Sequence, residues 1–193
     1  MEENKVTPAL KLIIIGGSAG SLEVLLGILP RLGPLPGHAL VLVLHRKTSE
    51  DTTLEELLEL KSAIPVMEVE DKTPLTPGYL HIAPSGYHLL FEKNGELALD
   101  ASEKIHYSRP SIDVAFESAA CVFGSSLTAI LLSGANADGA LGIKAVENSG
   151  GVTVVQRPDT AEVPFMPQSA LNTTPVDLIL DAAGILSFIN SLT

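Results

Sequence analysis

The feature that most constrains the fold of this chain is an alternation of short apolar runs with longer segments of helical periodicity. The runs lack polar alternation, which is typical of strands that are buried on both faces of a parallel sheet. We expect strands at Leu12–Ile15, Ala39–Leu44, Val66–Val69, Leu127–Leu132, Val152–Val155 and Leu178–Leu180. We expect helices at Leu22–Leu32, Thr53–Ser62, Ser111–Phe123, Ala140–Asn148 and Ala182–Leu192, with a shorter one at Met166–Leu171. This alternation predicts an α/β fold: a three-layer, doubly wound, mainly parallel sheet.

The middle of the chain departs from this rhythm. Three short strand-like runs follow one another there, at Tyr79–Ala83, Tyr87–Glu92 and Glu96–Asp100. An Asn-Gly pair at residues 94–95 separates the last two runs, and such a pair between strands is a hairpin signal. We therefore expect an antiparallel hairpin insertion at about residues 79–100. No repeat or linker divides the sequence, so residues 1–193 are expected to form one domain.

Composition narrows the class of protein. The chain has 193 residues, of which 46% are hydrophobic and 18% charged, as in a packed globular domain. No apolar run approaches the roughly 20 residues of a membrane helix, and the start of the chain is polar, so a cytoplasmic location is expected. The net charge is −11, and no basic cluster exceeds Arg46-Lys47, so neither nucleic acid nor an anionic membrane is an expected partner. The single cysteine, Cys121, excludes an internal disulfide; its apolar neighbours predict a buried position.

Candidate functional residues follow three of the predicted strands. Ser18 lies in a Gly-rich turn after the first strand, His45 directly follows the second, and Asp138 lies shortly after the strand at 127–132. Ligands of open α/β sheets bind beyond the carboxyl ends of the strands, so these side chains can meet in one crevice. A hydroxyl nucleophile needs a base, and an imidazole base needs a carboxylate to orient it. The pattern predicts a Ser-His-Asp site.

Each residue taken alone has another interpretation. The turn around Ser18 could bind a phosphate, although serine replaces two of the three glycines of a dinucleotide fingerprint, at Ser18 and Ser21. His45 stands where that fingerprint wants an acid, and could otherwise be structural. Asp138 could simply be the N-cap of the helix that begins near Ala140. The order Ser-His-Asp along the chain also differs from the Ser-Asp-His order of α/β-hydrolases.

Several motifs together resemble the catalytic domain of the CheB family of chemotaxis receptor methylesterases. They are Ile-Gly-Gly-Ser-Ala-Gly (15–20), Val-Leu-His (43–45), Pro-Gly-Tyr-Leu-His-Ile-Ala-Pro (77–84), Ser-Arg-Pro-Ser-Ile-Asp (108–113), Leu-Leu-Ser-Gly-Ala-Asn-Ala-Asp-Gly-Ala (131–140) and Met-Pro-Gln-Ser-Ala (166–170). The resemblance implies that Ser18 is the nucleophile, His45 the base and Asp138 its orienting carboxylate. It further implies an oxyanion hole made by the backbone N–H groups of Ala19 and Ala135, and a place for Arg109 in the substrate cleft.

The same resemblance implies a function. It points to hydrolysis of glutamate γ-methyl esters on the cytoplasmic helices of chemoreceptors, and to deamidation of glutamine at such sites. The partner is then the methylated chemoreceptor cytoplasmic domain, with a separate regulatory protein left open, because no receiver domain of the kind common in the family precedes the first strand. No cofactor is implied, and no metal, since the five histidines lack metal-ligand spacing.

Three residues keep a degenerate, non-catalytic domain open. Ala135 and Asn136 replace the Met and second Gly of the usual family loop before the aspartate, and Arg157 follows Gln156 where the family usually has an acidic or amide residue. The alternatives are therefore a degenerate esterase-like binding module in a signalling complex, a serine esterase with another substrate, and a nucleotide-binding flavodoxin-like domain.

Overall fold

The computed structural model describes residues 10–46 and 52–192, and its centre is a seven-stranded, all-parallel sheet. The strands lie in the order β10-β9-β8-β1-β2-β5-β3. Their bounds are β1 Lys11–Gly17, β2 His38–Leu44, β3 Val66–Glu68, β5 Leu80–Ile82, β8 Leu127–Leu131, β9 Val152–Gln156 and β10 Leu178–Leu180. The expected strands of the main sheet are thus confirmed, with ends that shift by one or two residues.

The central strands are apolar throughout because both faces of the sheet are covered. All seven residues of β2 are buried. In β1, Ile13 and Ile15 face one hydrophobic cluster while Leu12 and Ile14 face the other. This alternation of direction along a strand explains why no polar alternation is seen in the sequence.

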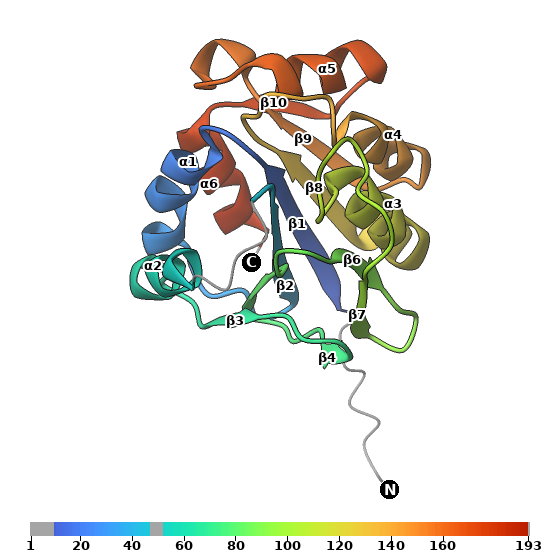
Figure 1. Cartoon of the computed structure of the whole chain (residues 1–193). Coiled ribbons are helices and arrows are strands. Elements are labelled where there is room, and N and C mark those ends of the chain that lie inside the picture. The colour runs from blue at the N-terminus through green and yellow to red at the C-terminus, as the bar shows by residue number, and fades with distance from the viewer. Residues whose placement is uncertain (1–9, 47–51, 193) are drawn as a thin grey trace, which may run out of the picture.

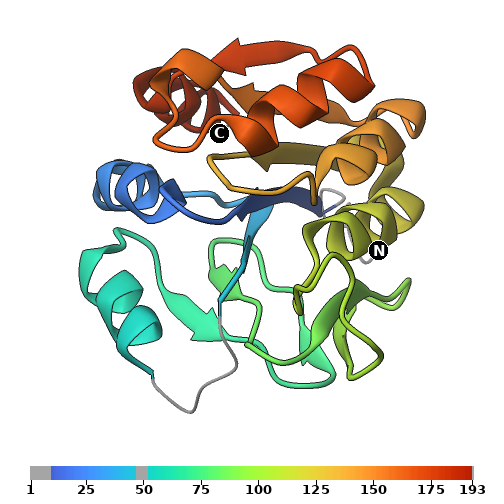
Figure 2. The ribbon, with the colours of Figure 1, turned by 45° about the horizontal axis from the view of Figure 1, so that its top comes forward.

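Three helices cover each face (Figure 1). On one face lie α1 Ser21–Ile28, α2 Thr53–Lys61 and α6 Ala182–Ser191; on the other lie α3 Ile112–Phe123, α4 Ala140–Asn148 and α5 Phe165–Thr173. Figure 2 shows the resulting layers, with α1 and α2 on one side and α3 and α4 on the other. Short 3₁₀ turns follow α1, α3 and β9, at Leu29–Arg31, Gly124–Ser126 and Pro158–Thr160. The three-layer, doubly wound architecture predicted from the sequence is confirmed.

The predicted hairpin insertion is only partly right. A small antiparallel sheet exists, in the order β4-β7-β6, formed by β4 Thr73–Pro74, β6 His88–Phe91 and β7 Glu96–Asp100. Its turn contains Gly95 at φ 85°, as the Asn-Gly pair predicts. The Tyr79–Ala83 run, however, forms β5, which joins the main sheet in parallel between β2 and β3.

The run that forms β5 was predicted as a strand but assigned to the wrong sheet, and its polar residue His81 favoured that assignment. Its neighbours Leu80 and Ile82 are buried, and so is His81 itself, which breaks up the run of apolar residues in the sequence. Inside the protein the imidazole is satisfied: Nε2 lies 3.2 Å from the Thr76 N–H and Nδ1 lies 3.3 Å from the Leu40 carbonyl. Burial lowers the pKa of His81, so it stays neutral.

The prediction of a buried position for Cys121 is wrong, since this residue is exposed on α3.

The order of the strands predicts where a ligand would bind along the sheet. From β1 the chain passes to β2 on one side, and it later returns to place β8 on the other side of β1. The winding direction therefore reverses between β1 and β8, and a crevice is expected at the carboxyl ends of the strands there. In the described part of the chain, no helix is long and apolar enough to cross a membrane.

Candidate active site

Ser18 lies in the tight turn between β1 and α1. Its N–H donates to the Ser133 carbonyl at 2.9 Å, and its own carbonyl accepts from Ser21 Oγ at 2.6 Å. The turn closes at Gly20, the N-cap of α1, which has φ 79° and so adopts the left-handed conformation that favours glycine. These contacts hold the half-buried Ser18 at the carboxyl edge of the sheet.

His45 lies directly beside this turn. Gly17 pairs with Leu44 in the β1–β2 ladder, and the His45 N–H donates to the Gly17 carbonyl at 3.1 Å. The imidazole is 9% exposed, and its Nε2 lies 2.6 Å from Asp138 Oδ2. With Nε2 taken by the carboxylate, Nδ1 is the nitrogen left to accept a proton. Neither Nδ1 nor Ser18 Oγ has a hydrogen-bond partner in the described part of the chain, so the two are not joined to each other.

Asp138 is completely buried and rests on the N-terminus of α3. Its Oδ1 accepts from Ser111 Oγ at 2.8 Å and from the Asp113 N–H at 2.9 Å, and its Oδ2 accepts from the Ile112 N–H at 2.7 Å. Burial by itself raises the pKa of Asp138, but the hydrogen bonds from His45 and from the start of α3 outweigh it, so this pKa is lower than usual. Asp138 is a carboxylate, stabilised by the positive end of a helix.

The interpretation of Asp138 as the N-cap of the following helix is therefore wrong. Gly139 is the N-cap of α4, with φ 98° and no side-chain cap. Asp138 instead contacts a helix that begins 26 residues earlier, because the turn after β8 brings its carboxylate over α3. Sequence spacing alone could not reveal this contact.

Asp113 was missed in the sequence. It lies beneath Asp138, and its Oδ1 accepts from the Gly139 N–H at 2.8 Å and the Gly142 N–H at 2.7 Å. Burial, together with the adjacent negative charge of Asp138, raises the pKa of Asp113 to about 6. The sequence offered Asp113 as the last residue of the Ser-Arg-Pro-Ser-Ile-Asp motif (108–113) and as an acid two residues after the N-cap Ser111. An acid is ordinary in a first helical turn, so neither signal gave it a role of its own.

Of the two predicted oxyanion donors, Ala19 directly follows Ser18 in the chain, and Ala135 follows Gly134. Ala19 and Ala135 are both exposed, and neither backbone N–H donates to another residue of the described chain. The segment that carries Ala135 packs tightly against the serine turn: a Cβ placed on Gly134 would lie 3.0 Å from Ser18 Cβ and 2.4 Å from Met166 Cε. Both N–H groups are thus without an acceptor within the described residues, and their role as oxyanion donors stays a prediction.

The guanidinium of Arg109 contacts backbone carbonyls of the protein, whereas its predicted role is to contact the substrate. Its Nη1 donates to the carbonyls of Ala101 and Ser102, at 2.7 and 2.6 Å, so the guanidinium holds this loop. Its own carbonyl accepts from the Gly86 N–H at 3.2 Å. A contact between Arg109 and a substrate stays a prediction.

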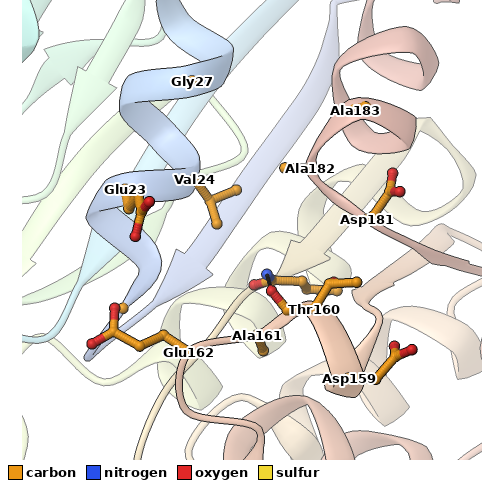
Figure 3. Close-up of a pocket in the computed structure, with 12 residues that line it drawn as sticks. Glu23, Val24, Gly27, Asp159, Thr160, Ala161, Glu162, Asp181, Ala182 and Ala183 are labelled. Carbon is orange, nitrogen blue, oxygen red and sulfur yellow. Dashed lines mark hydrogen bonds between the residues drawn. The ribbon is translucent and has the colours of Figure 1, made fainter.

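A pocket of about 550 Å³ opens next to the serine turn, between the starts of α1 and α6 (Figure 3). It does not include Ser18, His45 or Asp138, but it begins at Gly20. Four carboxylates lie in its wall, from Glu23, Asp159, Glu162 and Asp181. Within residues 10–46 and 52–192 no group of three His, Cys, Asp or Glu side chains is arranged to hold a metal ion.

Comparisons with known proteins agree with this geometry. The family model for the CheB methylesterase matches residues 13–189. A putative protein-glutamate methylesterase/protein-glutamine glutaminase of Leptospira interrogans is 41% identical over 173 residues, which cover 90% of each chain. A protein-glutamate methylesterase/protein-glutamine glutaminase of Symbiobacterium thermophilum is 36% identical over 89% of this chain, which spans about half (49%) of that relative's length.

A solved structure is also similar. The CheB methylesterase catalytic domain of Thermotoga maritima superposes with a TM-score of 0.90 at 31% identity, over 96% of this chain and 100% of that domain. Fold, sequence and the arrangement of residues at the strand ends therefore lead to one conclusion: the chain belongs to the CheB methylesterase family.

Proposed function

We propose that this protein is a protein-glutamate methylesterase, which hydrolyses the γ-methyl esters of glutamates on the cytoplasmic helices of chemoreceptors and deamidates glutamine at such sites. The observation that carries the proposal is the 2.6 Å hydrogen bond between His45 Nε2 and Asp138 Oδ2, at the strand ends directly beside Ser18. The names of the relatives support it. The substrate places the protein in the cytoplasm, where those helices lie.

The first step is attack by Ser18. Asp138 accepts the Nε2 proton of His45 and so keeps a lone pair on Nδ1. Once substrate is bound, Ser18 Oγ turns to donate to Nδ1, and Nδ1 takes its proton as Oγ bonds to the ester carbonyl carbon. The carbonyl π electrons move onto oxygen, and the N–H groups of Ala19 and Ala135 stabilise that charge.

The second step releases the products. The carbon–methoxy bond breaks, and His45 gives its proton to the leaving oxygen, so methanol departs and a glutamyl ester of Ser18 remains. Water then attacks this ester as His45 takes a proton from it; the proton returns to Ser18 Oγ, and glutamate is released. With glutamine the same steps release ammonia in place of methanol.

Arg109 is assigned to the substrate cleft. The segment that contains it, residues 108–113, leads into the N-terminus of α3, on which Asp138 rests. A guanidinium at this position has spare N–H donors for carbonyl or carboxylate groups of a receptor helix.

The test is methanol release from a methylated receptor cytoplasmic fragment, together with labelling by a fluorophosphonate probe. Wild type is expected to do both, and Ser18→Ala neither. The matched control is Ser187→Ala, an exposed serine on α6 that should behave as wild type. Labelling without methanol release would indicate an esterase with another substrate, and no labelling would indicate a binding module.

A further inference from the structure

Asp113 forms a closed set of hydrogen bonds at the base of the candidate site. Its N–H donates to Asp138 Oδ1 at 2.9 Å, while its Oδ1 accepts from the N–H groups of Gly139 and Gly142 at 2.8 and 2.7 Å. The residue is only 5% exposed. It thus joins the start of α3 to the start of α4, on both sides of Asp138.

This junction requires close contact between the two helices. A Cβ on Gly142 would lie 2.6 Å from Phe116 Cβ and 3.2 Å from the Asp113 Cα. Gly139 is held at φ 98°, a conformation that side chains rarely adopt. The glycines let the α4 amides reach the Asp113 carboxylate, which explains how one side chain can bind both.

We propose that Asp113 is a positioning residue of the esterase site, which holds Asp138 against His45 and whose ionised carboxylate supports the positive charge that His45 gains during the reaction. The proposal rests on the function proposed above. Asp113 acts on His45 through Asp138. The Asp113 backbone N–H donates to Asp138 Oδ1, and Asp138 Oδ2 is hydrogen-bonded to His45 Nε2.

The charge of Asp113 changes between pH 5 and pH 8, a range in which the activity of the protein can be measured. Titratable groups face it from several packed elements: Asp138 from the turn before α4, His45 beyond Asp138, His106 with Nε2 3.9 Å from Asp113 Oδ2, and His88 of β6, whose Nδ1 accepts the Ser111 N–H. Burial and Asp138 raise the pKa of Asp113 to about 6, so it is ionised at pH 8 and mostly protonated at pH 5. The proposed support for His45 is therefore present at pH 8 and lost at pH 5.

The test compares Asp113→Asn with wild type across pH 5–9. Asparagine keeps the shape and an Oδ1 acceptor for the two glycine amides, but carries no charge at any pH. The rates to measure are the labelling of Ser18 by a fluorophosphonate and methanol release from methylated receptor. The control is Glu117→Gln, which removes one exposed carboxylate from the same helix.

We expect Asp113→Asn to lower kcat about 10-fold at pH 8, with KM nearly unchanged, because a nearby charge alters a proton equilibrium by about one unit. The ratio of wild-type to variant rate should approach 1 near pH 5, and Glu117→Gln should give a ratio of 1 throughout. A ratio that is constant with pH, or no loss at pH 8, would overturn the proposal.

A second measurement covers the case in which the variant does not fold. In wild type, the Asp113 carboxyl ¹³C signal should titrate near pH 6, and the labelling rate of Ser18 should fall with the same midpoint; a midpoint below pH 5 overturns the proposal. The two proposals fail differently. If Ser18 is never labelled, the esterase function fails, whereas labelling with a constant ratio refutes only the role of Asp113.

Discussion

The Asp138 carboxylate accepts hydrogen bonds both from His45 and from the N-terminus of α3, and a neutral amide could not accept all of them. Its Oδ2 receives both the His45 Nε2–H and the Ile112 N–H, and its Oδ1 receives Ser111 Oγ and the Asp113 N–H. An amide NH₂ at either position would point a donor at other donors. The carboxylate is thus required by the start of α3 as much as by the imidazole.

Asp138→Asn is accordingly expected to lower activity by a factor on the order of 10³–10⁴. If the amide NH₂ faces His45, Nε2 must accept, and the remaining proton moves to Nδ1, where it blocks the transfer from Ser18. The rate of fluorophosphonate labelling measures this loss, and circular dichroism checks the fold. A variant that labels at the wild-type rate would contradict the assigned role.

Asp113 also makes the free energy of unfolding depend on pH, and this free energy changes with pH in the opposite direction to that expected for a salt-bridged acid. Its pKa rises from 3.8 to about 6 on folding, so the folded protein holds a proton that the unfolded chain has already released. The free energy of unfolding should therefore fall as pH rises from about 3.8 to about 6, by up to roughly 3 kcal/mol, and stay lower above that window. Asp113→Asn should be more stable than wild type at pH 8 but not at pH 4, as urea denaturation at both pH values can measure. Equal stability differences at the two pH values would exclude this linkage.

At the scale of elements, the contact between α3 and α4 depends on Gly142. An alanine there would press on Phe116 Cβ and on the Asp113 backbone, neither of which is the end of a flexible side chain. Gly142→Ala should therefore destabilise the fold by about 1–3 kcal/mol despite its better helix propensity, and should weaken catalysis by moving Asp113.

Gly27 provides the matched control for this prediction. It lies within α1, and a Cβ there would meet nothing within 4 Å. Gly27→Ala is thus expected to leave activity unchanged and to raise stability by roughly 0.5–1 kcal/mol. Thermal melts of the two variants give the comparison, and similar changes in both would contradict it.

The elements themselves were largely predictable because buried parallel strands consist of unbroken apolar runs. The place of β5 in the main sheet was not, because its buried His81 resembles a surface residue until its partners, the Leu40 carbonyl and the Thr76 N–H, are known. In the candidate site, the positions of Ser18, His45 and Asp138 after their strands could be read from the sequence. The contact of Asp138 with α3 and the presence of Asp113 could not, since both depend on how the turn after β8 lies over a helix 26 residues earlier.

At the scale of the whole molecule, the proposed catalytic residues come together only when the central strands are assembled. Ser18 follows β1, His45 follows β2 and Asp138 follows β8, which are adjacent in the sheet but distant in the chain. No fragment that lacks one of these strands can hold the site.

Labelling of Ser18 should consequently disappear at or before the loss of helical circular dichroism as urea increases, and never after it. Parallel titrations with both readouts test this expectation. Ser18 that still reacted with the probe after the helical signal had gone would show that reactivity does not need the assembled sheet.

The anchoring of Asp138 to α3 has a consequence for how new specificities could arise. Ala135 and Ala137 are exposed on the turn before it, whereas the carboxylate is fixed from below by a helix that takes no part in that turn. Mutational drift or deliberate redesign can therefore vary the outward positions while the acid keeps its place. The exposed side chains of residues 135 and 137 can thus change while the groups that the proposed reaction uses, the Ala135 backbone N–H and the Asp138 carboxylate, are kept.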